Sequence, residues 1–543
     1  MSRSPSWPAG RLQWELSGAG LQNLALRERP VPSPGAEELL VRIDACGICF
    51  SDIKILRLGG EHPRLQGRDL ERDPVVMGHE VAMTVMQVGE ARRAQFQPGQ
   101  RFLIQADIIY RGEGLAFGYK LAGGYSQYQL IGPEVLDGDE GCYLLPVSRG
   151  VGYSQAALAE PWACVEASYA CAPRTAPQPG GSRLVVVAAN ADRAPEAQPW
   201  PDDRASGREL QVDGSDADAP QLIAEHAPYD DVLFWGAPAQ AIVDAVTGCL
   251  EKGAVIRWER VPAGVRRALD VGSIHYRGHW HVSTPESGSG DAYAWPRGAE
   301  MTPGGQALFI GAGGPLGQMQ LQRTFALPAP PAHVVVSQRS GPRLEHLRQT
   351  FEPLAKAKGV RFTLLDARAL GDEVYTRARE ATGGAGFDDI VVVVPNARVV
   401  EQVVPLAAAG GGVNLFAGIG VGTKASIPLD CLRQGVRLWG TTGSTIADLR
   451  RIVEKVESGA LDTDSVVAAV GGIRAVCEGL EAVRDGRFLG KTVIYPQLER
   501  LPLTTVEDLA AQHPSLAERL GPGGAWNSAA EAELLRLYQA GAK

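Results

Sequence analysis

Two stretches of this chain occur twice in the same order, and this internal repeat constrains the fold more than any other feature. PGGSRLVVVAAN begins at Pro179 and PGGQALFIGAGG begins at Pro303, an offset of 124 residues. YDDVLFWGAPAQAIVDAVTGCLEKGAVI begins at Tyr229 and aligns without a gap with the stretch beginning at Phe387, an offset of 158 residues. Because the matches keep their order at both ends of the unit, we interpret them as a duplication rather than as chance likeness between two strand–helix units.

The duplicated region alternates strands with helices, a pattern typical of parallel βαβ units. The offsets differ by 34 residues, so copy one (179–300) is expected to lack about one helix and one strand relative to copy two (301–485). Residues 191–220, rich in Pro, Asp and Ala, indicate a solvated loop or linker. The identical pairs of the second repeat are Asp230/Asp388, Asp231/Asp389, Ala239/Ala397, Val246/Val404, Gly253/Gly411 and Val255/Val413.

The regions that flank the repeat have other patterns. Residues 1–178 contain short alternating strands separated by Gly and Pro, which predicts a mostly β domain. Residues 497–543 contain two apolar-periodic stretches, LTTVEDLAAQHPSLAERL and SAAEAELLRLYQAG, which predict a helical tail. Thr505 is suited to cap the first helix, with Asp508 in its first turn.

Composition excludes several classes of protein. Lys and Arg number 53 against 62 Asp and Glu, a net charge of -9 without a basic stripe, which argues against a nucleic-acid partner. No apolar run approaches the roughly 20 residues of a membrane helix, and the N-terminus lacks the apolar core of a signal peptide. Eight Cys in 543 residues are too few for a disulfide scaffold. We therefore expect a cytoplasmic protein with reduced thiols and no membrane partner.

A glycine turn at the start of copy two is the candidate nucleotide site. It follows the strand ALFI, precedes a helix, and comprises Gly311, Gly313, Gly314, Pro315, Leu316 and Gly317. Glycines let the backbone approach a pyrophosphate, which then lies at the helix N-terminus. A ligand-free turn is the alternative, but the position between strand and helix favours a dinucleotide.

Copy one has side chains where copy two has these glycines. By the 124-residue offset, the equivalent positions are Val187, Ala189, Asn190 and Arg193. Their side chains would occupy the space of the pyrophosphate, so copy one is expected not to bind a dinucleotide in this way.

The second strand of copy two bears on the choice of cofactor. NAD sites usually place an acidic residue near its end, to bind the ribose 2′-hydroxyl. This chain offers Gln338, Arg339 and Arg343 there, with no acid. An Arg beside a hydroxyl suits a 2′-phosphate, which favours NADP over NAD, although Arg339 as a solvated surface charge is the alternative.

Metal-binding residue types gather in the N-terminal region. The stretches are Cys46-Gly-Ile-Cys49-Phe-Ser51-Asp52, Gly78-His79-Glu80 and Glu160-Pro-Trp. Catalytic zinc takes three ligands from thiolate, imidazole and carboxylate groups and keeps an open position. The C-x-x-C spacing also fits a redox dithiol or half of a zinc ribbon, but no second C-x-x-C exists and the region is rich in β-strands.

Several stretches together resemble the zinc-dependent medium-chain dehydrogenase/reductase superfamily, especially its sorbitol (polyol) and threonine dehydrogenase branches. They are GICFSD, GHE, GGYSQY at 123–128, AEPWACVEA, GAGGPLG and GRFLGKTVIYP. The resemblance implies an α/β multidomain fold: a GroES-like β domain at 1–178, rejoined by 486–496, and a Rossmann domain in copy two. Copy one would then be an inserted, shortened Rossmann-like domain.

The resemblance also implies roles for individual residues. The family motifs make Cys49 and His79 zinc ligands, with Glu160 as the carboxylate ligand of the polyol branch. Glu80 would be a neighbour of the metal or an exchangeable ligand. Ser51 would relay the proton, and Asp52 would orient a ligand from outside the coordination sphere.

This chain departs from the family in two places near the metal. Residues 90–141 contain no Cys, so the second, structural zinc of many relatives is not expected. The position five residues after Cys49, where relatives often have a His, is Lys54. Lys54 could relay protons, bind an anionic substrate or lie in solvent.

We therefore expect a zinc- and NAD(P)-dependent dehydrogenase for a secondary alcohol: a polyol, sugar alcohol, sugar phosphate or amino alcohol. It would act as a homo-oligomer, a dimer or tetramer. The alternatives are a zinc-free NADP-dependent enone or quinone reductase and a non-catalytic nicotinamide-binding protein. The cluster His275, His279 and His281 is expected to be ordinary packing, with a place at the substrate cleft or a second metal as alternatives.

Overall fold

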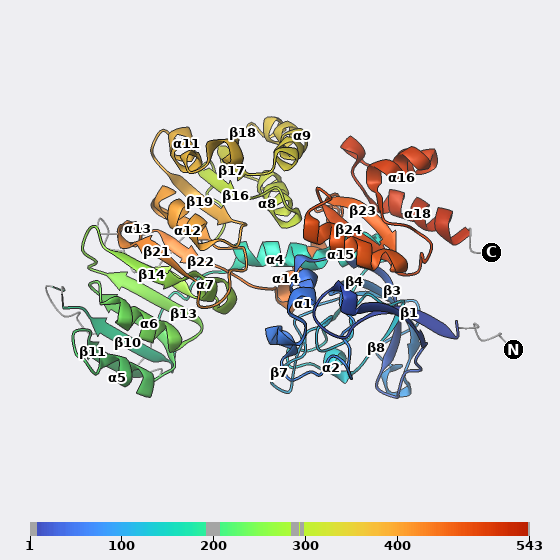
Figure 1. Cartoon of the computed structure of the whole chain (residues 1–543), viewed down its shortest axis with the longest axis horizontal. Coiled ribbons are helices and arrows are strands. Elements are labelled where there is room, and N and C mark those ends of the chain that lie inside the picture. The colour runs from blue at the N-terminus through green and yellow to red at the C-terminus, as the bar shows by residue number, and fades with distance from the viewer. Residues whose placement is uncertain (1–7, 190, 192–206, 284–292, 294–297, 541–543) are drawn as a thin grey trace. The chain divides into compact units, whose positions relative to one another are not determined.

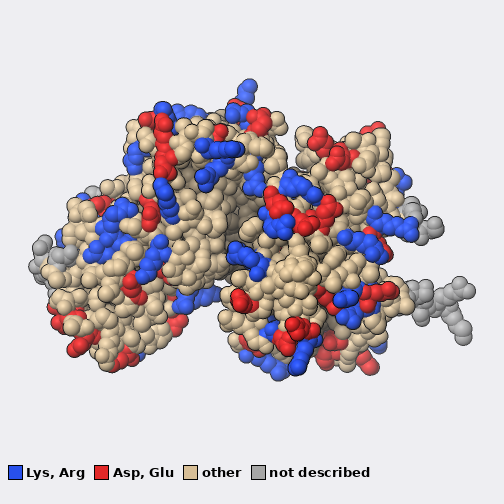
Figure 2. All heavy atoms as spheres, in the orientation of Figure 1, with Lys and Arg blue, Asp and Glu red and all other residues tan. Residues whose placement is uncertain are grey.

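The computed structural model describes residues 8–189, 191, 207–283, 293 and 298–540 (Figure 1). The chain divides into two compact units, which are described separately. Unit 1 comprises residues 1–164 and 443–543, and unit 2 comprises residues 165–442. None of the described helices combines the length and the hydropathy that a bilayer-spanning segment needs. Acidic and basic side chains are interspersed on the face seen in Figure 2.

Unit 1 is built on an eight-stranded sheet that takes strands from both ends of the chain. Its order is β25-β23-β24-β3-β4-β5-β9, and β8 also pairs with β3. The strands are β3 (Leu39–Gly47), β4 (Glu80–Val88), β5 (Arg101–Ile104), β8 (Tyr128–Ile131), β9 (Leu144–Pro146), β23 (Val467–Gly472), β24 (Lys491–Tyr495) and β25 (Thr504–Thr505). Strands β1 (Gly10–Leu16) and β2 (Leu24–Pro30) form an antiparallel pair, as do the short strands β6 (Ile109–Tyr110) and β7 (Glu113–Gly114).

The boundaries of unit 1 differ from those expected from the sequence. Residues 443–485 belong to unit 1 rather than to copy two, and its N-terminal part ends at 164 rather than at 178. The reason is strand pairing, because β23 is parallel to β24, and β24 pairs with β3. Ile473, Val476 and Leu480 are fully buried in the same core as Leu39 and Val41.

The C-terminal tail is folded onto unit 1. The helices of this unit are α1 (Phe50–Leu58), α2 (Pro133–Leu136), α3 (Tyr153–Ala157), α14 (Ile446–Glu457), α15 (Val476–Asp485), α16 (Val506–Gln512), α17 (Pro514–Ala517) and α18 (Ser528–Ala540), with α4 (Ala159–Ala170) running on into unit 2. The predicted cap of α16 is present, since the Thr505 hydroxyl accepts from the Asp508 amide at 3.0 Å. Trp526 is fully buried and donates to the Ser154 hydroxyl.

Unit 2 contains one eleven-stranded sheet in the order β11-β10-β12-β13-β15-β22-β20-β19-β16-β17-β18. Copy one supplies β10 (Ser182–Val187), β11 (Arg208–Asp213), β12 (Tyr229–Trp235), β13 (Leu250–Glu259) and β15 (Trp280–Val282). Copy two supplies β16 (Gln306–Ile310), β17 (His333–Gln338), β18 (Arg361–Asp366), β19 (Phe387–Val392), β20 (Ala407–Asn414) and β22 (Arg437–Trp439). Strands within each copy are parallel, and the copies meet where β15 is antiparallel to β22.

The helices of unit 2 show which part copy one lacks. They are α5 (Ala219–Glu225), α6 (Gln240–Gly248) and α7 (Val271–Arg277) in copy one, and α8 (Pro315–Ala326), α9 (Gly341–Ala357), α10 (Ala367–Leu370), α11 (Glu373–Ala381), α12 (Ala397–Val403) and α13 (Leu429–Arg433) in copy two. Among the described residues, α5 alone lies between β11 and β12, whereas copy two has α9, β18, α10 and α11 between β17 and β19. The described part of copy one therefore lacks one strand, as the offsets predict, and both the long helix α9 and the short helix α10. Most of the 191–220 segment lies outside the described residues.

The paired aspartates perform the same local task in both copies. In copy one, Asp230 accepts from the Ser182 amide and Asp231 from the Gln178 amide, both at 2.8 Å. In copy two, Asp388 accepts from the Gln306 amide and Asp389 from the Thr302 amide, also at 2.8 Å. The acceptors are related by the 158-residue offset and the donors by the 124-residue offset. This equivalence confirms the duplication at the level of individual hydrogen bonds.

The two copies also pair with each other through equivalent strands. β14 (Arg266–Asp270) of copy one is antiparallel to β21 (Lys424–Pro428) of copy two, with Ala268 opposite Ser426, its own equivalent at the 158-residue offset. Arg266 lies opposite Pro428, and Asp270 lies opposite Lys424. Such reciprocal pairing is what a two-fold axis produces in a symmetric dimer. Unit 2 is therefore a pseudo-symmetric pair with one continuous core drawn from both copies.

Candidate active site

The first turn of α1 and the start of β4 place the predicted metal residues side by side. Cys49 is the N-cap of α1, and the Asp52 carboxylate accepts from the Cys49 amide at 3.0 Å. His79 and Glu80 stand where β4 begins, and Glu80 pairs with Gly47 at the end of β3. Because the chain leaves β3 and enters α1 within two residues, these groups meet at one end of the strand pair.

Three groups converge closely enough to hold one metal ion. Ligand atoms of Cys49, His79 and Glu80 all lie within 4.8 Å of one another. His79 Nε2 is 3.3 Å from the Ser51 hydroxyl, and its Nδ1 is 3.6 Å from Asp52 Oδ1. A carboxylate next to the second ring nitrogen is the arrangement that usually orients a metal-bound histidine.

The electrostatics of this cluster suit a cation. The buried atoms Asp52 Oδ1, His79 Nδ1 and Glu80 Oε2 have no hydrogen-bond partner. Burial acts to lower the pKa of His79, yet the adjacent side chains of Asp52 and Cys49 raise it well above its ordinary value. Orphaned buried polar atoms are costly unless something binds them. The donor set of thiolate, imidazole and carboxylate fits zinc.

Glu160 lies near this cluster but outside its closest group. It is in the first turn of α4, where the Cys164 thiol donates to it at 3.7 Å. Burial raises the pKa of Glu160 to about 7, and the charge of His79 opposes that rise. The Glu160 side chain is therefore within electrostatic reach of His79, while Glu80 is the carboxylate that the structure brings into the group.

Cys46 has a different environment from Cys49. It is fully buried in the core of unit 1, with its Sγ 3.6 Å from its neighbour's carbonyl at Gly47. A Cβ added at Gly78 or Gly124 would lie 2.8 Å from that sulfur. Burial raises the pKa of the Cys46 thiol well above its ordinary value. Cys46 is thus a packing residue, and it is not in the metal-competent group.

Three neighbours of the cluster were not assigned a role from the sequence. Lys491 forms a buried ion pair with Glu80, although 411 positions separate them. The Tyr125 hydroxyl donates to Asp52 Oδ2 at 2.7 Å, and Tyr119 forms a side-chain hydrogen bond with Ser51. Two of these residues lie in stretches singled out in the sequence: Lys491 in GRFLGKTVIYP and Tyr125 in GGYSQY. We find no sequence signal that would have identified Tyr119.

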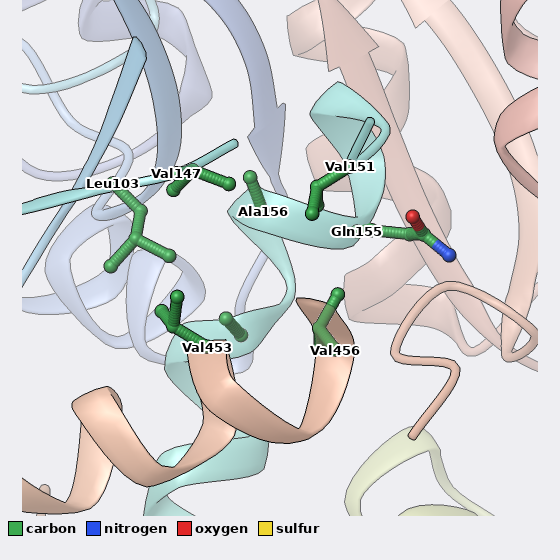
Figure 3. A pocket seen from close by; sticks show the side chains of 8 residues that line it. Leu103, Val147, Val151, Gln155, Ala156, Val453 and Val456 are labelled. Carbon is green, nitrogen blue, oxygen red and sulfur yellow. The ribbon is translucent and has the colours of Figure 1, made fainter. Parts of the chain in front are cut away.

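A small apolar pocket elsewhere in unit 1 is not a second candidate. It lies among α3, α4 and α14, and its only polar lining side chain is that of Gln155 (Figure 3). The lining residues are Leu103, Val147, Val151, Gln155, Ala156, Ala159, Val453 and Val456. None of them is titratable or belongs to the cluster around His79.

The glycine turn of copy two has the geometry of a nucleotide site. Gly314 caps the twelve-residue helix α8, which begins at Pro315. Gly311 has a φ of 82°, which favours glycine. A Cβ at Gly317 would lie 2.4 Å from the Ala312 Cα, and one at Gly313 would lie 2.1 Å from Gln338 Nε2. The turn therefore tolerates side chains at none of these three positions, and its backbone is open to a phosphate at a helix N-terminus.

The end of β17 lies against the same turn. Gln338 is buried, and its side-chain oxygen accepts from the amide of Arg339 at 2.8 Å. A Cβ at Gly313 would be 2.9 Å from the Arg343 Cβ, and one at Gly314 would be 4.0 Å from Arg343 Nη1. Arg339 is exposed. The structure thus brings Gln338 and Arg343 to the glycine turn, with Arg339 beside them in sequence.

The equivalent turn of copy one is only partly described. Val187 is the last residue of β10, and Ala189 lies two residues beyond it. Asn190 and Arg193 lie outside the described residues. Where the chain is described, side chains replace the glycines of copy two.

The histidines of copy one have separate partners. His275 Nδ1 lies 3.1 Å from the Leu415 carbonyl, and His279 Nε2 lies 3.1 Å from the Glu251 carbonyl. The Trp258 indole donates to His281 Nδ1 at 3.1 Å, and burial lowers the pKa of His281 to about 3. These contacts are those of packed side chains, and the described residues show no convergence on a metal.

Comparison with known proteins points to the same family that the sequence motifs resemble. The sequence profile of the alcohol dehydrogenase GroES-like domain matches residues 35–136. Mannitol-1-phosphate 5-dehydrogenase of Aliivibrio fischeri is 23% identical over 96% of both chains, and L-sorbose 1-phosphate reductase of Klebsiella pneumoniae is 24% identical over 95% of both. The two alignments therefore include the inserted copy.

Solved structures share the fold. A zinc-binding dehydrogenase from Sinorhizobium meliloti 1021, crystallised with NADP, is 18% identical and superposes with a TM-score of 0.52, covering 90% of this chain and 100% of that one. With the GroES-like domain at 35–136, the Rossmann sheet and the cysteine–histidine–carboxylate cluster in place, the chain is similar in sequence motifs and in fold to the zinc-dependent medium-chain dehydrogenase/reductase superfamily.

Proposed function

We propose that the protein is a zinc- and NAD(P)-dependent oxidoreductase that interconverts a phosphorylated sugar alcohol and its ketose phosphate. The observation that carries the activity is the convergence of Cys49, His79 and Glu80, with buried atoms that lack partners. The substrate class is supported by the two relatives that align along nearly the whole chain, since one name specifies a sugar-alcohol phosphate and the other a ketose phosphate.

The residues around the cluster have distinct tasks in this proposal. Cys49 and His79 would hold the zinc, with Glu160 or Glu80 as the carboxylate. Bound zinc supplies Lewis acidity toward the substrate oxygen. Lys491 neutralises Glu80 through their buried ion pair. Asp52 orients His79 and is itself held by a neighbouring tyrosine hydroxyl.

Ser51 is positioned to hold the proton of the substrate hydroxyl. Its hydroxyl is 3.3 Å from His79 Nε2 and is hydrogen-bonded to Tyr119. A hydroxyl that contacts both a metal ligand and a second hydroxyl can accept one proton while donating another.

Copy two would bind the nicotinamide cofactor, which supplies the hydride chemistry. The pyrophosphate would lie at the N-terminus of α8, over the turn at Gly311, Gly313 and Gly317. Gln338, Arg339 and Arg343 would contact the ribose of the adenosine half, and the absence of an acid at that strand end favours NADP over NAD.

Two further expectations are part of the proposal. We place the protein in the cytoplasm. We also propose that the protein forms a homo-oligomer, a dimer or tetramer. Strands β14 and β15 of copy one are already paired with β21 and β22 of copy two, so they are not available for pairing with another chain. Contacts between chains would therefore use another surface.

Metal analysis tests the site directly. The dialysed enzyme should contain about one zinc per chain. Cys49→Ala should lose nearly all of it, and with it at least a thousandfold of turnover, while Cys46→Ala should keep most of both. Two tightly held zinc ions per chain, or exchanged behaviour of the two variants, would contradict the assignment. An active enzyme without metal would favour the zinc-free reductase.

A further inference from the structure

We propose that Lys54, His62 and Arg64 form a subsite for the phosphoryl group of the substrate, hereafter the phosphoryl cluster. This inference rests on the proposed function, which it deepens by assigning the group that selects phosphorylated substrates. All three residues belong to unit 1, and they lie beside the metal cluster on the side of Tyr119.

The local fold brings two cationic side chains, Lys54 and Arg64, together with the imidazole of His62. Lys54 is on α1, three residues after Ser51 and therefore on the same side of that helix. His62 caps the short turn that follows, where its Nδ1 accepts from the Arg64 amide at 3.3 Å. The charges of Arg64 and Lys54 both reach His62: burial, then Arg64, then Lys54 lower its pKa to about 4.

One aromatic ring borders both the phosphoryl cluster and the metal cluster. The Tyr119 ring centroid is 5.4 Å from that of His62 and 5.9 Å from that of His79. The Arg64 guanidinium carbon lies 5.1 Å from the centroid of the same ring. The two clusters are thus separated by about the width of one ring. A polyol chain with a phosphate at one end spans that separation with a few carbon–carbon bonds.

The donors of the cluster fit a phosphate monoester. Arginine presents a planar fork of N–H groups that binds phosphate oxygens in pairs. One nitrogen of Arg64 is held by Asp107, and 42% of the Arg64 side chain is exposed. Since His62 Nδ1 accepts a hydrogen bond, its proton is on Nε2, which is then a second donor. Lys54 adds a positive charge.

Two acidic residues near Arg64 make the phosphoryl cluster selective for a phosphate over a neutral hydroxyl. Asp107 pairs with Arg64, and the charge of Glu160 reaches it as well. A neutral hydroxyl gains little by displacing these contacts, whereas a phosphate dianion brings enough charge to compete for the guanidinium. Asp107 is therefore a positioning residue that holds Arg64 beside Tyr119.

The test compares phosphorylated and unphosphorylated substrates in matched variants of the zinc-loaded enzyme. Arg64→Met should raise KM for mannitol 1-phosphate or L-sorbose 1-phosphate at least thirtyfold, with kcat within threefold. Arg64→Lys should recover part of the loss. The control is Arg57→Met, which removes an exposed cation from the last turn of α1 and should behave as wild type. Equal losses for phosphorylated and free substrates, or a fall in kcat alone, would overturn the subsite.

Binding measurements separate this inference from the proposed function. In calorimetry, the wild-type enzyme should bind inorganic phosphate, and Arg64→Met should bind it at least tenfold more weakly. If no polyol phosphate is turned over with either cofactor, the proposed function fails, and phosphate binding lost in Arg64→Met still supports the cluster. If the wild-type enzyme turns over a sugar phosphate but Arg64→Met binds inorganic phosphate as tightly as the wild type, the phosphoryl cluster is overturned and the proposed function stands.

Discussion

Copy one and copy two of unit 2 have kept the same packing and differ where a ligand would bind. In both copies, one aspartate carboxylate accepts a hydrogen bond from the amide of the residue that begins the first strand. A second aspartate accepts from an amide in the loop before that strand, and all four N–O distances are 2.8 Å. Copy two has glycines at its first turn, whereas the described positions of copy one have Val187 and Ala189. The comparison teaches that a duplicated domain retains the residues that fold it, while the residues of its first turn are free to change.

A second difference lies at the interface of the two copies. Asp270 caps α7 by accepting from the amides of Gly272 and Ser273, and it also accepts from the Gly422 amide in copy two. Its equivalent at the 158-residue offset, Pro428, caps α13 without a side-chain hydrogen bond. On the other side, the Gly264 amide, the equivalent of Gly422, donates to the Asp430 carboxylate of copy two at 2.9 Å, so the hydrogen bond is reciprocal but its acceptor comes from a different position in each copy.

The largest expected effect separates the two copies as cofactor sites. Gly313→Val should remove dinucleotide binding, at least a hundredfold, because its side chain would displace Gln338 and fill the space of the pyrophosphate. Ala189→Val in copy one should leave binding unchanged. Calorimetric titration should show one site per chain in the wild type. Two sites, or loss of binding only in Ala189→Val, would reverse the roles of the copies.

A smaller effect measures the difference between the two equivalent positions Asp270 and Pro428. Asp270→Ala should lower the free energy of unfolding by about 2 kcal/mol, since it removes a helix cap and leaves the Gly422 amide without this acceptor. Pro428→Ala should cost about 1 kcal/mol or less, an effect on the unfolded chain alone. Denaturant unfolding of both variants checks this order, and equal losses would show that the two positions contribute alike.

The smallest effect concerns the phosphate on the adenosine ribose. Arg339→Ala should raise KM for NADP about tenfold relative to its effect on KM for NAD, since an Arg–phosphate contact contributes roughly 1.5–3 kcal/mol. Arg348→Ala on the exposed face of α9 is the control, because Arg348 pairs with Glu345 instead. Steady-state kinetics with both cofactors give the answer. A wild-type enzyme that strongly prefers NAD would refute the assignment.

Much of this architecture was predictable because its signals are local. The duplication, the glycine turn and the pairing of Cys49 with His79 can all be read from short motifs. The end of copy two could not be predicted, because residues 443–485 continue the strand–helix alternation of that copy. Only the pairing of β24 with β3 assigns them to unit 1. Lys491 beside Glu80 and Tyr119 between the two clusters are likewise products of long-range folding.

The antiparallel pairing of β14 with β21 bears on how this chain can evolve. In a symmetric dimer of identical chains, every substitution at the interface occurs twice, and each must be compatible with its own copy. Here the two faces are encoded separately, so a change on one face meets an unaltered partner. Because the faces are joined covalently, their contact also does not depend on protein concentration. Asp270 facing Lys424, with Arg266 facing Pro428, is such a divergence: a symmetric site has become two different ones.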